Sequence, residues 1–179
     1  MSQVVRAVND QQKAMVWALV AVRMAVRKAL RSAVKPDFRQ LKTLLTYVER
    51  FAEQQHQVNE DRHIFRPLET REPAMARAIA LLRRDHSAMK GYRIRLEEAL
   101  TYWEKGDPKA GVQAPMVAED YLHFCQRHAR KERDLLPALR RICSDTEWTE
   151  IERAYASVAD PLLGAKSRRE RMKALQAFD

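Results

Sequence analysis

The chain has 179 residues, 46% of them hydrophobic and 32% charged, a composition that suits one soluble helical domain with a sizeable core. It has only four Gly, which argues against a sheet. Its two cysteines, Cys125 and Cys143, form no C-x-x-C pair, which argues against a disulfide scaffold and an oxidising compartment. The net charge of +9 gathers in two basic runs, Arg23 to Lys35 and Lys166 to Lys173, but no recognition motif accompanies them, so nucleic acid is not the expected partner.

The first apolar run, MVWALVAVRMAV at residues 15–26, bears on membrane insertion and targeting. It follows a polar segment, contains Arg23 and is too short to span a bilayer. We therefore expect a cytoplasmic protein without a membrane partner.

Four long amphipathic helices are predicted in chain order. They cover about residues 3–34, 36–70, 73–105 and 115–144, each with an apolar stripe at helical spacing. Lys35-Pro36-Asp37 and Gly106-Asp107-Pro108 are typical helix breaks, and Pro67 predicts a kink or a frayed end in the second helix. Four such helices with short joins predict an all-α, antiparallel up-down-up-down bundle.

The pattern of long amphipathic helices ends at Ser144, where we expect the bundle domain, residues 1–144, to end. Ser144 to Glu147 offers caps for a short helix, and a basic helix is predicted over residues 165–178. We expect this extension, residues 145–179, to pack on the bundle or to form a dimer contact.

Two copies of an H-x-x-x-E pattern are the strongest functional signal. His56 and Glu60 lie one turn apart on the second helix, on a predicted stripe that also includes His63, and His128 and Glu132 repeat the spacing on the fourth. His86 lies midway along the third helix. Near the middle of a bundle these groups can converge, and such a mixed nitrogen and oxygen set suits iron, manganese or zinc.

Other interpretations of these residues stay open. A histidine on an apolar stripe is more often a core residue, and H-x-x-x-E is also an ordinary polar pair within a helix. A ferritin-like scheme is rejected because residues 11–35 contain no Asp, Glu, His or Cys. We interpret His63 as a second-layer or channel residue, His123 as a surface residue, and Cys125 as a buried thiol more often than a metal neighbour.

With these residues in hand, the chain resembles the hemerythrin-like family, also called HHE cation-binding domains, over about residues 8–158. The resemblance is carried by three stretches and a following Trp. They are His56-Gln57-Val58-Asn59-Glu60-Asp61 with Ile64-Phe65-Arg66-Pro67, Asp85-His86, His128-Ala129-Arg130-Lys131-Glu132 with Leu135-Leu136-Pro137, and Glu147-Trp148.

The resemblance implies a non-haem di-iron centre that binds O2 or related small molecules, or that senses iron or redox state. His56, His86 and His128 would be terminal ligands, and Glu60 and Glu132 would bridge the metals. One departure matters, because Gln12 stands where the family has a histidine in the first helix. An amide is a weaker ligand for iron than an imidazole, so the site holds two irons weakly, one metal or none.

Three function classes follow. The first is a non-haem iron protein that binds or senses O2 or another small molecule. The second is a peroxidase or oxidase that uses the same centre, with its substrate near Gln12. The third is a degenerate, metal-free helical protein that binds a partner through its basic C-terminal helix or the apolar face of its first helix, or self-associates as a homodimer.

Overall fold

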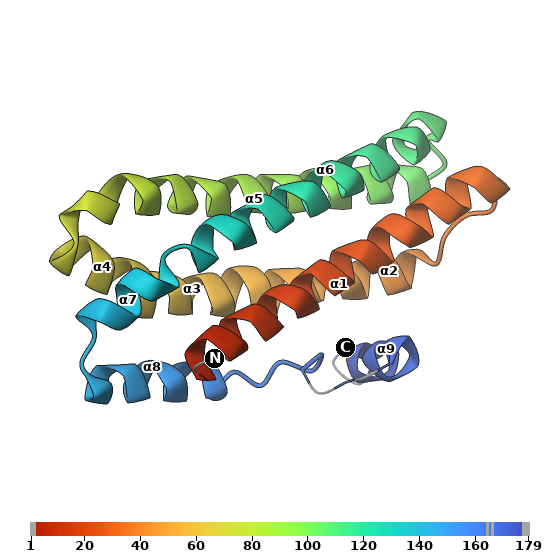
Figure 1. The fold of residues 1–179 in the computed structure, drawn as a ribbon. Coiled ribbons are helices and arrows are strands. Elements are labelled where there is room, and N and C mark those ends of the chain that lie inside the picture. Colours follow the sequence, from red (N-terminus) through yellow and green to blue (C-terminus); the bar gives the residue numbers. More distant parts are fainter. Residues whose placement is uncertain (1–2, 164, 166, 177–179) are drawn as a thin grey trace.

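The computed structural model describes residues 3–163, 165 and 167–176 of the chain, and all regular structure in these ranges is helical. Four long helical rods lie side by side (Figure 1). The first rod is α1 (Gln3–Ser32), the third is α5 (Ala76–Glu104) and the fourth is α6 (Pro108–Arg133). The α1 and α5 rods each contact both the second rod and α6, which closes the bundle and confirms the predicted all-α architecture.

The second rod is one continuous helix that contains two π-helical segments. It runs through α2 (Phe38–Tyr47), η1 (Val48–His56), α3 (Gln57–Glu60), η2 (Asp61–Phe65) and α4 (Arg66–Arg71). A short 3₁₀ turn, η3 (Pro73–Met75), then leads into α5. Because π turns hold more residues than α turns, they shift which side chains share a face, and they recur at functional sites.

The π turn of η2 corrects one expectation. A regular α-helix would place His63 on the stripe of His56 and Glu60, but His63 lies within the π turn of η2 and is half-buried, whereas the next residue, Ile64, is fully buried. Pro67 lies in the first turn of α4, directly after this π turn, and the rod continues through it.

The fourth helix differs from its predicted bounds at both ends. It begins at Pro108 rather than Pro115, because Asp107 caps it by accepting a hydrogen bond from Lys109 N, and Pro115 is buried within it. It ends at Arg133, and a separate short helix, α7 (Leu136–Ile142), follows. Proline suits the first turn of a helix, and Pro137 occupies that place in α7.

The C-terminal extension returns along the bundle as α8 (Asp145–Ala156) and α9 (Arg168–Gln176) (Figure 1). Ser144 and Glu147 form the predicted capping box at the start of α8. The α8 helix packs against α1 and α9 packs against α2, while Tyr47 donates a 2.8 Å hydrogen bond to Asp160 in the segment between them. The domain boundary at residue 144 stays a prediction, and residues 166, 177 and 178 of the predicted last helix lie outside the described ranges.

Two apolar clusters fill the interior, one toward each end of the bundle. Leu19, Leu44 and Leu96 belong to the first, and Val8, Phe65 and Leu82 to the second. Between them, each of the four rods contributes polar side chains to one layer. Six of these side chains are no more than 5% exposed: Gln11, Gln12, His56, Glu60, His128 and Glu132. Buried polar groups are costly unless paired or metal-bound, so this layer marks the candidate site. None of the described helices is both long and apolar enough to cross a lipid bilayer.

Candidate metal centre

Two overlapping groups of potential ligands occupy the polar layer. One comprises Glu60, His86 and His128, and the other His56, Glu60 and Glu132. Within each group the potential ligand atoms all lie within 4.8 Å of one another. The structure thus brings together all five residues singled out by the sequence, from the second, third and fourth rods, and Glu60 belongs to both groups.

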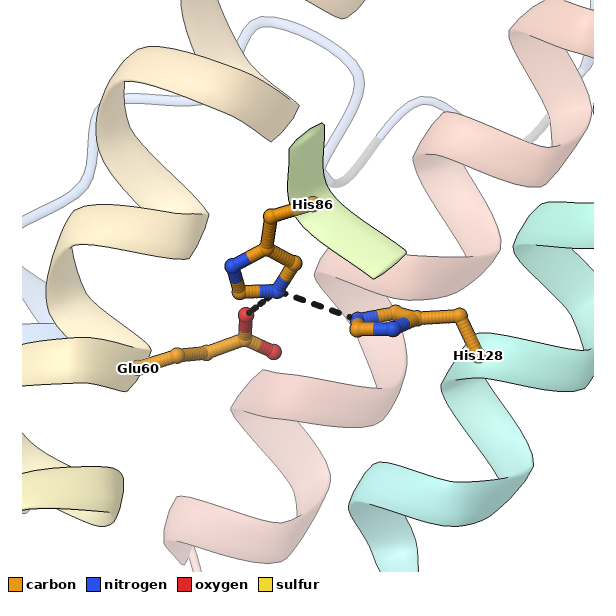
Figure 2. A group of neighbouring side chains, drawn as sticks. All are labelled: Glu60, His86 and His128. Atoms are coloured by element: carbon orange, nitrogen blue, oxygen red, sulfur yellow. Dashed lines mark hydrogen bonds and ion pairs between the residues drawn. The ribbon is translucent and has the colours of Figure 1, made fainter. Parts of the chain in front are cut away.

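The first group places two imidazoles opposite one carboxylate (Figure 2). His86 Nε2 lies 3.2 Å from His128 Nε2 and 3.0 Å from Glu60 Oε2. Phe65 stacks on the His86 ring, with centroids 5.7 Å apart, and so limits its rotation. Two facing ring nitrogens beside a carboxylate oxygen are a convergent donor set for one cation.

The second group lies on the other side of Glu60. His56 Nε2 lies 2.9 Å from Glu60 Oε1 and 3.8 Å from Glu132 Oε2. Glu60 therefore directs one oxygen toward each group, whereas Glu132 belongs to only one of them. The geometry supports a bridging role for Glu60, and the predicted bridging role of Glu132 stays a prediction.

Several donor atoms of this layer are buried without a hydrogen-bond partner. They include both carboxylate oxygens of Glu60, Oε1 of Glu132 and Nδ1 of His128. The neighbouring imidazoles are near Glu60 but outside hydrogen-bonding geometry. Unsatisfied buried lone pairs cost free energy, and a metal ion shared by these atoms would satisfy them. The donor set therefore fits iron, manganese or zinc.

When no metal is bound, the buried histidines and carboxylates of the layer balance one another's charges through their protonation states. Burial opposes protonation of His56, but the negative charge of Glu60, aided by Glu132, outweighs it and raises the pKa of His56 to about 10. Burial would raise the pKa of Glu60, yet the adjacent His56 cation holds it well below its usual range. Burial and the charge of Glu60 raise the pKa of Glu132, while burial lowers the pKa of His128 to about 4.

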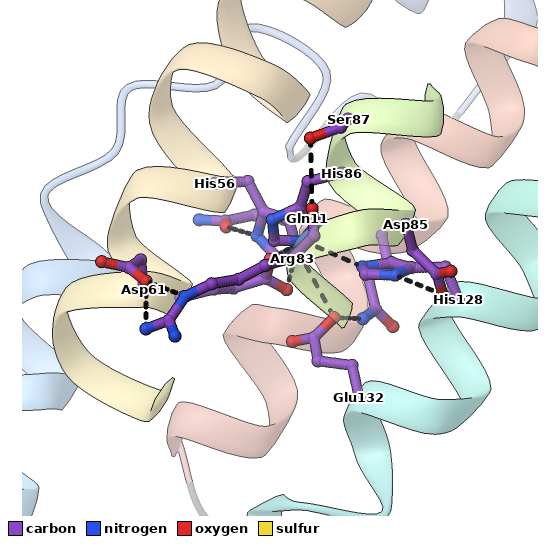
Figure 3. A network of polar contacts seen from close by, with 11 residues as sticks. Gln11, His56, Asp61, Arg83, Asp85, His86, Ser87, His128 and Glu132 are labelled. Atoms are coloured by element: carbon purple, nitrogen blue, oxygen red, sulfur yellow. Dashed lines mark hydrogen bonds and ion pairs between the residues drawn. The ribbon is translucent and has the colours of Figure 1, made fainter. Parts of the chain in front are cut away.

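Neighbouring side chains orient the two outer imidazoles (Figure 3). Gln11 Oε1 lies 2.8 Å from His56 Nδ1, so a proton on Nδ1 would leave Nε2 to face the centre. Asp85 Oδ2 lies 3.5 Å from His128 Nδ1 and is held by a 2.7 Å ion pair with Lys131. A hydrogen-bonded partner such as Gln11 fixes the tautomer and direction of a metal-binding histidine, whereas the carboxylate of Asp85 acts on His128 as a nearby charge.

Gln12 enters the layer from α1. Its amide nitrogen donates a short hydrogen bond to Glu132 Oε2, and its own Oε1 is buried without a partner. The residue that departs from the family pattern therefore points into the centre, on the side of Glu132.

The structure also shows where the remaining histidines and the two cysteines lie. His63 belongs to neither ligand group and lies near Glu150 of α8, while His123 is exposed beside Glu119. Both cysteines are free and buried, and Cys125 is in neither group.

Two residues near the centre were not foreseen. Gln11 occupies a stripe position between Val8 and Met15, where an uncharged amide gave no ligand signal. Tyr155 of α8 lies edge-on to His56, with ring centroids 6.4 Å apart. Its place on the apolar stripe of α8, after Trp148 and Ile151, indicates burial but not a position beside the centre.

The sequence model described as "Hemerythrin HHE cation binding domain" matches residues 4–139, which span all four rods and all five candidate ligands. No curated protein and no solved structure matches the chain.

Proposed function

This chain belongs to the hemerythrin HHE cation-binding domain family, and on that premise we propose that it holds a non-haem di-iron centre and binds or senses O2 or a related small molecule. A neutral histidine and carboxylate set of this kind suits iron, and it would also accept zinc or manganese. When bound, iron would supply redox chemistry and a coordination position for the small molecule.

The observation that carries the proposal is the position of Glu60 between two ligand groups. Its Oε1 lies 2.9 Å from His56 and its Oε2 lies 3.0 Å from His86, and within the described part of the chain neither oxygen has a hydrogen-bond partner. One carboxylate that serves two groups with separate oxygens favours a two-metal centre over a mononuclear one. His86 and His128 would hold one metal, and His56 with Glu132 the other.

The apolar surroundings of the layer support small-molecule binding. The two apolar clusters lie on either side of it, and they would exclude bulk water from a bound ligand. Gln11 and Asp85 would keep the histidines in place when a ligand enters or leaves.

Metal stoichiometry tests the proposal. The protein would be loaded with ferrous iron without oxygen, freed of excess metal and analysed for iron. We expect close to two irons per chain, close to none for Glu60→Ala, and an unchanged value for the surface variant Asp120→Ala. One iron per chain would reject the two-metal centre, and none in a folded protein would reject iron binding.

A surface cleft next to Gln12 favours a peroxidase or oxidase as the second candidate. The cleft, about 440 Å³ in volume, lies between α1 and α6, and Gln12, Trp17, Ala129 and Arg133 are among its lining residues. It would give a substrate access to the Gln12 side of the centre. Turnover of peroxide with a reductant by the iron-loaded protein, slowed when Ala129→Leu fills the cleft, would support this candidate, and no turnover would exclude it.

The metal-free alternative rests on the charge compensation within the layer. A protonated His56 beside an ionised Glu60, with Gln12 donating to Glu132, gives a paired arrangement that needs no ion. In that case the chain would act through a partner surface, such as the basic α9 helix. A folded protein that takes up no iron at any loading would favour this alternative over both iron-based candidates.

A further inference from the structure

Tyr155 brings the C-terminal extension into contact with the candidate metal centre. It lies on α8, outside the residues matched by the family model, and its side chain is 1% exposed. Its ring lies edge-on to His56 at 6.4 Å between centroids. Of the two ligand groups, Tyr155 therefore adjoins the one that contains His56.

The hydroxyl of Tyr155 is buried and has no hydrogen-bond partner among the residues that the structure describes. Buried tyrosines normally pair their hydroxyl, because an unmet polar group in the core costs free energy. The charged groups that act on this hydroxyl are Glu60 and Glu132, both of them candidate ligands. The Tyr155 oxygen thus lacks a hydrogen-bond partner among the described residues. The carboxylates of Glu60 and Glu132, which act on it, also have oxygens without such a partner.

The His56 group is also the one with the weaker ligand set. The group of His86 and His128 has two imidazoles, whereas that of His56 and Glu132 has one, and Gln12 contributes only an amide beside Glu132. A further anionic oxygen would strengthen this side, and tyrosine is an established iron ligand in proteins. Ferric iron, a hard cation, favours such oxygen donors.

We propose that Tyr155 is an additional metal ligand, which binds ferric iron through its phenolate oxygen on the side of His56 and Glu132. The inference rests on the proposed di-iron function and extends it. On binding, the O–H bond of the phenol breaks, the oxygen forms a bond to the metal, and the proton is released to solvent without a change in oxidation state. The extension after residue 144 would in this way replace part of what the first helix lacks at Gln12.

Absorption and resonance Raman spectra of the iron-loaded full chain test this assignment. Ferrous protein would be oxidised in air, and we expect a visible phenolate-to-iron charge-transfer band with phenolate ring modes enhanced on excitation within it. Tyr155→Phe, which removes only the hydroxyl, should abolish the band whatever its iron content.

Tyr121→Phe provides a matched control. Tyr121 is likewise a fully buried tyrosine with an unpartnered hydroxyl, but its charged neighbours are Glu53, Arg93 and Glu97 rather than the candidate ligands. This variant should keep the band. Two irons per chain without a phenolate band, or a band that survives in Tyr155→Phe, would overturn the assignment and leave the proposed function standing. Absence of iron from the folded wild type would overturn both.

Discussion

The side-chain amide of Gln12 on α1 donates a hydrogen bond to Oε2 of Glu132 on α6, across the buried layer of the bundle. The bond joins the residue that stands in place of the family's first-helix histidine to a candidate ligand. Gln12 is 4% exposed, so its side chain occupies the centre instead of turning to solvent. Glutamine at this position therefore changes which donor atoms the metal on that side can use, although the side chain still points into the centre.

Gln12→His should restore a strong donor at this position. The imidazole replaces a weak amide ligand, so we expect ferrous iron affinity to rise by about tenfold or more, the scale on which ligand environments tune metal sites. Competition with a chelator of known affinity would measure the change. Gln12→Ala, which supplies no donor, should not raise the affinity, and an equal gain in both variants would contradict the explanation.

Removing His86 or His56, one from each ligand group, should remove one metal. His86→Ala leaves His56, Glu60 and Glu132 in place, and His56→Ala leaves Glu60, His86 and His128. Each variant should bind close to one iron per chain by elemental analysis, while the exposed control His123→Ala should bind as many as the wild type. Two irons in either core variant would show that its histidine is not needed for metal binding.

Gln11 should act on the metal through His56. It accepts from His56 Nδ1 at 2.8 Å, and loss of such partners typically lowers metal affinity by about 10–100-fold. We therefore expect that decrease for Gln11→Ala in the chelator competition. Gln11→Glu keeps an acceptor at the same place and should retain most of the affinity, and equal losses in the two variants would point to a packing effect instead.

A stability prediction concerns Arg93, which is buried among three glutamates. Its guanidinium contacts Glu49, Glu53 and Glu97 at 2.8–3.2 Å, and the Glu53 side chain is only 9% exposed. Removing one partner of a buried ion pair costs about 3–5 kcal/mol. Arg93→Ala should lower the free energy of unfolding by that amount in urea titrations. Exchange of Arg127, an exposed residue, for Ala should cost less than about 1 kcal/mol.

The sequence predicted the fold well because the signals that specify it are local. Apolar stripes, proline breaks and the Ser144 cap each act within a few residues, so the four rods could be located from the sequence. The start of the fourth helix was misplaced because Pro115 resembles a helix start, while Asp107 is the residue that caps it.

The candidate site was predictable only where its residues carry a chemical signal of their own. His56, Glu60, His86, His128 and Glu132 could be singled out by residue type and spacing. Gln11 and Tyr155 could not, because an amide or phenol gains its role from neighbours distant in sequence. His63 was expected on the stripe of His56 and Glu60, but it lies half-buried in the π turn of η2, where the regular period on which stripe arguments depend is broken. Its interpretation as a second-layer or channel residue stays a prediction.

Metal uptake should strengthen as pH rises. Without metal, the nearby carboxylates raise the pKa of His56 to about 10, so it is protonated at neutral pH, and burial with the charge of Glu60 raises the pKa of Glu132. His56 must lose its proton to act as a ligand, so metal competes with protons and acid weakens binding. The raised pKa of Glu132 acts in the same direction. Each proton released makes the affinity change by about tenfold per pH unit.

Calorimetry would test this linkage. Titration of the metal in two buffers of different ionisation enthalpy, matched in pH and ionic strength, gives the number of protons released directly. We expect at least one proton, that of His56, for the metal on the side of His56. In His56→Ala the remaining metal binds beside His128, whose pKa burial lowers to about 4, so that histidine has no proton to release at neutral pH. The number of protons released should therefore fall in this variant, and an equal release in both proteins would contradict the assignment of the protons to the His56 side.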